Sequence, residues 1–454
     1  MALYISRIHI KNIRCFENIT IDLEQENKPV LWVTLLGDNA TGKTTLLRCI
    51  AIGLCDESSA AGLLRESEKG YIRRNSNKDG IIEITLNNSQ KPHEFYKIIT
   101  RIIKIKYRNE TFENLRQYIK RQSFINKEFE DIKVEDFPWR SIFISAYGIG
   151  RGSSGTGDIS GYSPISAVYN LFNYSEGLQN PELVLRRLGN DAFKDKIMPL
   201  LKSILNLKDE DKIFLEREGI EVDGPWGKRM PLRDLADGYR STFQWVLDLI
   251  GWAASRNVRA SSKIWIRGIV LIDSLEEHLH PRWQRTIVND LNKVFPDLQF
   301  IITTHSPLVA AGTTDIQKSQ LISLELDSNT HKTRWQNISK IDMQGRRADE
   351  ILRSEAFGLL STTSLGSVND LTKYCELLNK VKRNEKEEFE FNILREKVKD
   401  KYTFGDTYFE REVERAVLMT LKKLLRRKPE EIHKLETKKQ LAKIFGDNDA
   451  YEKN

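Results

Sequence analysis

Cysteine is scarce in this chain, and closely paired cysteines are missing. The 454 residues include only four cysteines, none in a C-x-x-C spacing (Cys15, Cys49, Cys55 and Cys375). This pattern argues against a disulfide framework and favours free, buried thiols in a reducing compartment. No run approaches the ~20 apolar residues of a membrane helix, and the first residues enter a strand-like pattern without a secretory signal. We therefore expect a cytoplasmic protein with no membrane partner.

The chain also lacks a strong excess of either charge. Lysine and arginine number 71 and aspartate and glutamate 64, which gives a net charge of +7, and both signs are interspersed over most of the sequence. This balance permits contact with nucleic acid but does not require it. The local exception is the basic run Leu421–Lys428. It fits an amphipathic helix with a solvated basic face, or a patch that contacts phosphates.

One octapeptide dominates what the sequence does contain. Residues 37–44, Gly-Asp-Asn-Ala-Thr-Gly-Lys-Thr, match the phosphate-binding pattern G-x-x-x-x-G-K-[ST]. An apolar, strand-like run precedes it, and a segment with helical spacing follows. A strand, a glycine turn and a helix start point several backbone N–H groups and the positive helix end at one anion. The motif predicts a site for ATP, with Lys43 on the β- and γ-phosphates and Thr44 on Mg²⁺.

A second motif supplies the acidic partner of that site. The run Ile269-Val-Leu-Ile ends in Asp273, as expected of a buried parallel strand that delivers a carboxylate to the magnesium shell. Three further segments accompany these two motifs along the chain. They are Leu235-Ala-Asp-Gly238 at a helix start, His278-Leu-His-Pro281, and the strand-like run that ends at His305.

Taken together, these motifs resemble the ABC-type ATPases of the RecF, SMC and OLD branch over roughly residues 1–315. The resemblance implies an α/β fold: an ABC-type P-loop head with a mixed central sheet, an antiparallel β subdomain and a helical lobe. It implies that Asp273 orders the metal's water and that His305 contacts the γ-phosphate as a switch. The residues implied in nucleotide binding are Gly37, Asn39, Gly42, Lys43, Thr44, Thr45, Asp237 and Gly238.

The resemblance also implies self-association. Asp237 and Gly238 would meet the γ-phosphate of an ATP bound to a second copy, so that ATP bridges a homo-oligomer of at least two chains. Arg14, Tyr147 and Arg151 are further candidates for the site, or are surface or packing residues.

Two positions depart from the family pattern. Ala40 stands where glycine is common, and Ser274 stands where a glutamate normally polarises the attacking water. Because a hydroxyl is a poor base at neutral pH, and loss of a positioned base costs ~10²–10⁴ in rate, we expect ATP binding with slow or absent hydrolysis. Glu276 and Glu277 lie close in sequence, but the turn need not aim them at the phosphate. These glutamates with His278 and His280 could alternatively form a metal site.

We divide the chain into an ATPase head at residues 1–340, with a helical lobe inserted at about 160–255, and a helical region at 341–454 for partner binding or oligomerisation. We expect strands at 4–11 and 19–23, an antiparallel sheet at 81–107, a charged helix at 113–133, and helices over 163–207. After residue 320 no strand set carries the acidic pattern of a TOPRIM nuclease, and no H-N-H pattern occurs.

The region Ala348-Asp-Glu-Ile-Leu352 and the helical tail extend the resemblance to PtuA proteins, the ATPase subunits of Septu anti-phage systems. This implies a small HNH nuclease partner (PtuB-like), ATP-regulated DNA cleavage by that partner, and DNA contact through the complex. One alternative is a DNA-repair ATPase of the RecF or SMC type with DNA-stimulated hydrolysis. Another is a transport ATPase, which Ser145-Ala-Tyr-Gly148 disfavours because it lacks the usual glutamine.

Overall fold

A computed structural model describes most of residues 3–399. The gaps are 67–69, 88–95, 108–110, 123–126, 132–141, 153–154, 156–161, 176, 190, 192, 217–218, 257–266, 328, 360–361, 363 and 381–382. The chain divides into two compact units, residues 1–360 and 361–454. Among the helices of the described ranges, none is long and apolar enough to span a bilayer.

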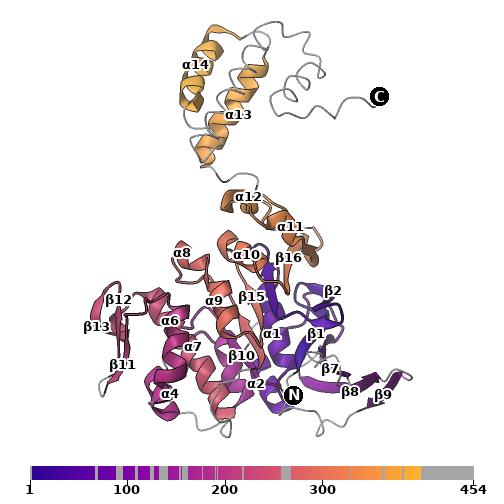
Figure 1. The fold of residues 1–454 in the computed structure, drawn as a ribbon. Coiled ribbons are helices and arrows are strands. Elements are labelled where there is room, and N and C mark those ends of the chain that lie inside the picture. Colours follow the sequence, from indigo (N-terminus) through magenta and orange to yellow (C-terminus); the bar gives the residue numbers. More distant parts are fainter. Residues whose placement is uncertain are drawn as a thin grey trace, which may run out of the picture. The chain divides into compact units, whose positions relative to one another are not determined.

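The first unit is built on a six-stranded mixed sheet in the order β10-β14-β15-β5-β16-β17 (Figure 1). Five strands run parallel, and only β17 is antiparallel to its neighbour. Every residue of β5, β14 and β15 is buried, which is typical of parallel strands covered on both faces. The bounds are β5 Trp32–Leu36, β10 Ile144–Tyr147, β14 Gly268–Ile272, β15 Leu298–Thr303, β16 Ser319–Asp327 and β17 Lys332–Ile338.

An antiparallel sheet lies beside the mixed one, in the order β2-β1-β6-β7-β8-β9. Its strands are β1 Tyr4–Ile13, β2 Phe16–Asp22, β6 Gly80–Asn87, β7 Tyr96–Ile105, β8 Phe112–Gln122 and β9 Lys127–Asp131. The sheet predicted for 81–107 is confirmed, but the helix predicted for 113–133 is wrong. That segment is β8 and β9, because β8 pairs along its length with the isoleucine-rich β7 and extends the sheet.

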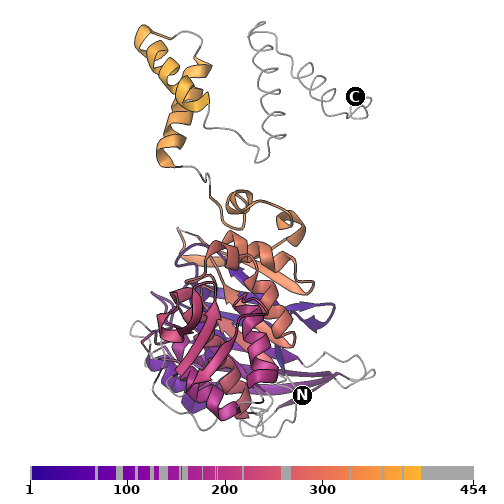
Figure 2. The ribbon, with the colours of Figure 1, turned by 60° about the vertical axis from the view of Figure 1, so that its left-hand side comes forward.

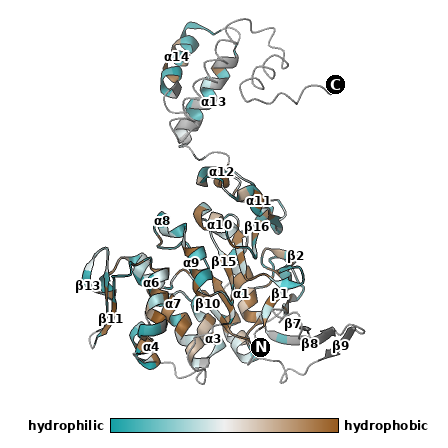
Figure 3. Ribbon diagram, in the orientation of Figure 1, coloured by the Kyte–Doolittle hydropathy of each residue, from teal (hydrophilic) through white to brown (hydrophobic). Residues whose placement is uncertain are grey.

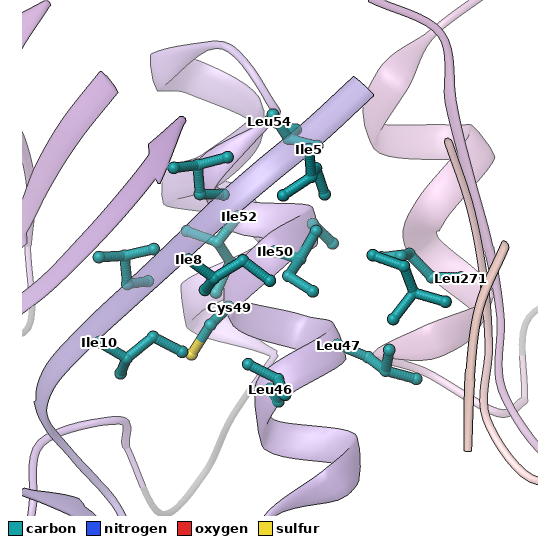
Figure 4. Close-up of a cluster of buried hydrophobic side chains, with 14 of the residues drawn as sticks. Ile5, Ile8, Ile10, Leu46, Leu47, Cys49, Ile50, Ile52, Leu54 and Leu271 are labelled. Carbon is teal, nitrogen blue, oxygen red and sulfur yellow. The ribbon is translucent and has the colours of Figure 1, made fainter. Parts of the chain in front are cut away.

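Helix α1, Lys43–Gly53, packs against the antiparallel sheet. Figure 4 shows Ile5, Ile8 and Ile10 of β1 facing Leu46 and Ile50 of this helix. All of them are almost fully buried. In Figure 3 the hydrophobic colour concentrates on α1 and the neighbouring strands, whereas α8 and α11 are mostly hydrophilic. The helix that begins at the P-loop lysine is therefore held by the main core of the protein.

The helices predicted within 163–207 are present but short: α3 Pro164–Val168, α4 Pro181–Leu188 and α6 Met198–Ile204. A three-stranded sheet follows, made of β11 Ile213–Glu216, β12 Gly219–Gly224 and β13 Gly227–Pro231, and then the long helix α7, Asp237–Arg256. Figure 1 shows α4, α6, α7 and β11–β13 together on one side of the first unit, and Figure 2 turns that side forward. Between β14 and β15 the chain forms two helices, α8 Pro281–Gln284 and α9 Ile287–Val294.

The β16–β17 hairpin was not predicted from the sequence. It adds an antiparallel edge to the mixed sheet, and the segment after it forms the short helices α11, Lys340–Met343, and α12, Ala348–Leu352. These helices belong to the first unit: Met343 and Ile351 pack with Leu36, Ala310 and Leu321 in one buried cluster. The functional division at residue 340 stays a prediction.

In the second unit, α13 Leu365–Asn379 and α14 Glu385–Lys399 pack as a pair. Leu377, Phe391 and Leu394 form their buried contact, and the ring of Tyr374 stacks on Phe391 with centroids 5.2 Å apart. The basic run Leu421–Lys428 and the helices expected after residue 400 lie outside the described residues.

Candidate nucleotide site

The P-loop joins β5 to α1, as the motif predicts. Gly37 and Gly42 have φ angles of 134° and 102°, values that favour glycine. Space is also limiting, since a Cβ on Gly42 would lie 2.5 Å from Cys15 Sγ. Ala40 adopts φ 67°, a left-handed conformation that costs a non-glycine residue about 1 kcal/mol. The departure at Ala40 therefore falls at a position whose backbone conformation favours glycine.

Lys43 is buried at the start of α1, and its Nζ donates to the carbonyl oxygens of Gly37 at 2.7 Å and Asp38 at 2.8 Å. Burial lowers the pKa of the Lys43 ammonium, while the charges of Asp273, Asp38 and Glu276 oppose that shift. Two backbone carbonyl oxygens of the P-loop thus hold the Lys43 ammonium group at the loop. Of the other P-loop residues, Asn39 is exposed and Thr45 is buried in the first turn of α1.

Thr44 and Asp273 meet at the carboxyl end of β14. Thr44 Oγ1 donates to Asp273 Oδ2 at 2.7 Å, and Thr303 Oγ1 donates to Asp273 Oδ1 at 2.6 Å. Asp273 is only 4% exposed. The sequence did not single out Thr303; its place in the Thr-Thr-His305 triplet at the end of an apolar strand was the available signal.

These oxygens suit a hard cation. Mg²⁺ binds one or two protein oxygens and completes its shell with phosphate oxygens and water. Thr44 and Asp273 supply a hydroxyl and a carboxylate side by side. Within the described ranges no group of three or more His, Cys, Asp or Glu side chains could hold a metal ion. The residues present therefore fit a magnesium ion that arrives with a nucleotide better than a metal held by protein ligands alone.

Ser274 follows Asp273 with φ 50°, and Arg151 holds the turn. The Arg151 guanidinium donates to the carbonyl oxygens of Asp273, Ser274 and Leu275 at 2.8, 2.7 and 3.2 Å. Arg151 is 1% exposed, and burial lowers its pKa to about 10 although Glu277, Glu276 and Asp273 favour its charged form. It is a buried clamp on the turn after β14 and not a surface residue.

Glu276 and His305 are also brought together. Glu276 Oε1 accepts from the His305 backbone N–H at 2.8 Å, and Oε2 accepts from Thr304 Oγ1 at 2.6 Å. The His305 side chain is exposed at the edge that carries Lys43. Desolvation by its surroundings and the Lys43 charge lower the pKa of His305. Sequence reasoning had left the direction of the Glu276 carboxylate open.

Asp237 and Gly238 open α7. Asp237 forms an ion pair with Arg240 at 2.7 Å, and a Cβ on Gly238 would lie 2.3 Å from the carbonyl oxygen of His278. The helix start therefore packs closely on the turn that follows Asp273. Neither residue hydrogen-bonds to the P-loop within the part of the chain that the structure describes.

The two histidines of the His278–Pro281 segment have local contacts. His280 Nδ1 caps α8 by accepting from the Arg282 N–H at 3.2 Å, and His278 Nε2 lies 3.8 Å from Glu277. His278 adopts φ 62° at the turn. These contacts shape the turn and the start of α8, and they do not converge on one point as metal ligands do.

The remaining candidates lie on either side of the site. Tyr147, at the end of β10, is buried and donates from its hydroxyl to Asp248 Oδ2 at 3.0 Å on α7. Arg14 lies over the ring of Tyr71, 4.7 Å from its centroid, and donates to the Gly70 carbonyl oxygen. Tyr147 therefore joins β10 to the helix that begins at Asp237.

A cavity of about 560 Å³ lies beside the turn that packs on the P-loop. Arg73 on its wall donates to the carbonyl oxygen of Cys15, whose Sγ touches the position of Gly42. The lining is mostly polar and includes one aromatic ring: Ile72, Arg73, Asn75, Ser76, Asn77 and Tyr107. None of these lining residues belongs to the P-loop, so we do not assign the cavity to the nucleotide.

Comparison with known proteins agrees with this geometry. The family model described as "AAA domain, putative AbiEii toxin, Type IV TA system" matches residues 33–311, from β5 into the helix after His305. The chain belongs to this AAA-domain family. The match spans the P-loop, the Asp273 strand and the His305 turn, and the predicted α/β class of the head is confirmed by its sheet.

Among curated proteins, the chain is similar to "Septu protein PtuA" of Bacillus mycoides (strain KBAB4), with 26% identity over 91% of this chain and 53% of that protein. It is also similar to "Retron Vc95 probable ATPase" of Vibrio cholerae serotype O1 biovar El Tor, with 31% identity over 34% of this chain and 36% of that one. The predicted resemblance to PtuA is confirmed. The chain spans about half the length, or less, of these relatives.

Among solved structures, similarity extends to the SMC head domain from Thermotoga maritima. The two share 12% identity with a TM-score of 0.44, over 75% of this chain and all of that one.

Proposed function

We propose that this AAA-domain protein binds ATP with Mg²⁺ at the P-loop and hydrolyses it slowly. The contact between Thr44 Oγ1 and Asp273 Oδ2 supports this most strongly, because it unites the hydroxyl and the carboxylate that magnesium needs at the end of the phosphate loop. The backbone from Gly37 to Gly42, with Asn39 and Ala40, surrounds the phosphates, and Lys43 neutralises them. Magnesium supplies Lewis-acid stabilisation of the phosphate charge when bound.

Slow turnover follows from the residue after Asp273. Ser274 offers a hydroxyl where a carboxylate base is needed. Arg151 binds the backbone carbonyl oxygens of this turn, and these groups do not serve as a base either. His305 faces the same edge and contacts the terminal phosphate in this proposal. The protein then holds ATP for long periods and reports its presence.

The bound nucleotide also bridges two copies of the chain. Asp237 and Gly238 stand at the N-terminus of α7, where backbone N–H groups and the helix dipole favour an anion. In this proposal they meet the γ-phosphate of an ATP bound to a second copy. The smallest assembly that completes the site is a homodimer.

The biological role that fits these properties is that of an ATP-sensing subunit in an anti-phage defence complex. Similarity to PtuA and to a retron ATPase supports it. In this role the chain recruits a small HNH nuclease through its C-terminal region, and ATP regulates cleavage of DNA by that partner in the cytoplasm. A chain that keeps its nucleotide intact suits a sensor.

Calorimetric titration with ATP and Mg²⁺ tests the proposal. We expect the wild type to take up nucleotide and Lys43→Ala to lose at least tenfold in affinity. Lys340→Ala is the matched control, because Lys340 Nζ also donates to two carbonyl oxygens, at 2.9 and 3.0 Å, but on another surface. No uptake by the wild type, or full uptake by Lys43→Ala, would refute nucleotide binding at this loop.

Plasmid cleavage and turnover measurements separate the two biological roles. The defence role predicts that a neighbouring HNH protein co-purifies with the full chain and cuts plasmid in an ATP-dependent manner. A DNA-repair ATPase predicts that DNA stimulates hydrolysis and that no nuclease binds. Strong stimulation by DNA without a nuclease partner would replace the first role by the second.

A further inference from the structure

Glu276 forms a bridge between two turns at the nucleotide edge of the mixed sheet. It belongs to the turn after β14, and its carboxylate accepts from Thr304 Oγ1 at 2.6 Å and from the His305 N–H at 2.8 Å, both on the turn between β15 and α10, Pro307–Thr314. Hydrogen bonds to an ionised acceptor are about twice as strong as neutral ones. Glu276 therefore uses both carboxylate oxygens to fix the peptide that carries His305.

Other contacts join these two turns, but they stop short of His305. The N–H groups of Ser274 and Leu275 donate to Thr303, to its Oγ1 at 2.8 Å and to its carbonyl oxygen at 3.0 Å. Within the second turn, Thr304 Oγ1 also accepts from the Ser306 N–H at 3.0 Å. The link from the Asp273 turn to the His305 backbone itself is made by the Glu276 side chain.

The charge of Glu276 acts on the same groups. It opposes the lowering of the pKa of Lys43 and of His305 by desolvation. The carboxylate is thus close enough to both basic side chains to influence them, on the edge where the γ-phosphate is expected. Its neighbour Glu277 instead lies next to His278.

We propose that Glu276 is a positioning residue: by holding the Thr304–His305 peptide, it aligns His305 with the terminal phosphate and sets the preference for ATP over ADP. This inference rests on the proposed nucleotide site. It assigns Glu276 a role through its two hydrogen bonds and not as a substitute for the base missing at Ser274. Each carboxylate oxygen accepts one bond from this peptide, which holds the Glu276 side chain against Thr304 and His305.

The test compares dissociation constants for ADP and for the non-hydrolysable analogue AMP-PNP, both with Mg²⁺, so that it does not depend on turnover. We define the preference as the Kd for ADP divided by the Kd for AMP-PNP. Glu276→Ala should lower this preference roughly tenfold, the effect of losing hydrogen bonds to a charged group. Glu276→Gln should stay within about threefold of the wild type, since the amide oxygen can accept from the His305 N–H and the amide nitrogen can donate to Thr304.

Two further variants make the test specific. His305→Ala should lower the preference by a similar factor, and the double variant of Glu276→Ala with His305→Ala should be no lower than His305→Ala alone, because coupled residues are not additive. Glu277→Gln removes the same charge one residue further along and should retain the preference. Thermal unfolding of each variant, with and without ADP, confirms that it is folded.

Failure of the proposed function and failure of the positioning role would give different results. Failure of the wild type to bind either nucleotide would refute the proposed function. Normal preference in Glu276→Ala, additive losses in the double variant, or equal affinity of the wild type for both nucleotides would overturn the positioning role alone. Glu276→Gln as impaired as Glu276→Ala would also overturn it, since the charge and not the pair of hydrogen bonds would then matter.

Discussion

Thr44 and Asp273 lie 229 positions apart in the chain, yet Thr44 Oγ1 donates to Asp273 Oδ2 at 2.7 Å. The contact exists because β5 and β14 are both neighbours of β15, so that their carboxyl ends open on the same edge of the sheet. Thr303, at the end of β15 itself, completes the arrangement from the other side of the carboxylate. One sheet edge thus assembles the phosphate loop, its metal residues and the His305 turn.

Replacing Thr44 by valine keeps the shape of the side chain and removes its hydroxyl. We expect Thr44→Val to weaken the magnesium-dependent part of ATP binding by about 10–100-fold, the usual effect of losing an oriented group at a metal site. Calorimetry with Mg²⁺ and with EDTA measures it. Thr85→Val, which removes a hydroxyl paired with Thr100 at 3.1 Å in the antiparallel sheet, is the control. Equal binding by Thr44→Val and the wild type would contradict the assignment of Thr44.

Restoring a carboxylate after Asp273 should accelerate hydrolysis. We expect Ser274→Glu to raise single-turnover ATP hydrolysis by roughly 10²-fold, the lower end of what a positioned base contributes. The lower end applies because φ 50° at this position disfavours a non-glycine residue and because Arg151 fixes the turn. Ser274→Gln is matched in size and cannot act as a base. Equal rates for the two variants, or wild-type turnover of about one per second that Ser274→Glu leaves unaltered, would refute the account of slow turnover.

Gly42 should tolerate no side chain. In Gly42→Ala, a Cβ at φ 102° would lie 2.5 Å from Cys15 Sγ and 2.7 Å from Phe16 Cζ, so backbone strain and a clash add. We expect a loss of about 2–4 kcal/mol in the free energy of unfolding, together with loss of ATP binding. Gly345→Ala is the control for backbone strain without a clash, because φ is 75° there and no atom lies within 4 Å of the added Cβ. That control should lose only about 1 kcal/mol in urea unfolding; equal losses would argue against the clash.

Asp248 gives the protein a pH-dependent stability. Burial raises its pKa to about 6, although the Gln179 N–H at 2.9 Å and the Tyr147 hydroxyl favour the ionised form. Between about pH 4 and pH 6 the folded protein therefore holds a proton that the unfolded chain releases, so stability from this group falls as pH rises through that window. Asp248→Asn should gain about 3 kcal/mol relative to the wild type between pH 4 and pH 6.5. Urea unfolding at several pH values measures this; a difference between the two proteins that is constant with pH would contradict it.

The sequence by itself determined the local chemistry of this protein. The glycine spacing of residues 37–44 requires a turn before a helix, the apolar run before Asp273 requires a buried strand, and the order of the motifs places them in one α/β head. Such signals are local because they arise from backbone conformation and from the period of hydrophobic residues. The absent base at Ser274 was equally visible, since it is a single residue in a fixed register.

Only the tertiary structure decided what these motifs contact. The segment 113–133 is charged enough to be mistaken for a helix, and it becomes strand because β7 offers it an unpaired edge. The hairpin β16–β17 likewise depends on pairing with β5, hundreds of residues earlier in the chain. Which strand ends meet decides three features of the site: the direction of the Glu276 carboxylate, the burial of Arg151 and the hydrogen bond from Thr303 to Asp273. Packing and long-range hydrogen bonds fix the direction of side chains at a sheet edge, and no local sequence pattern encodes them.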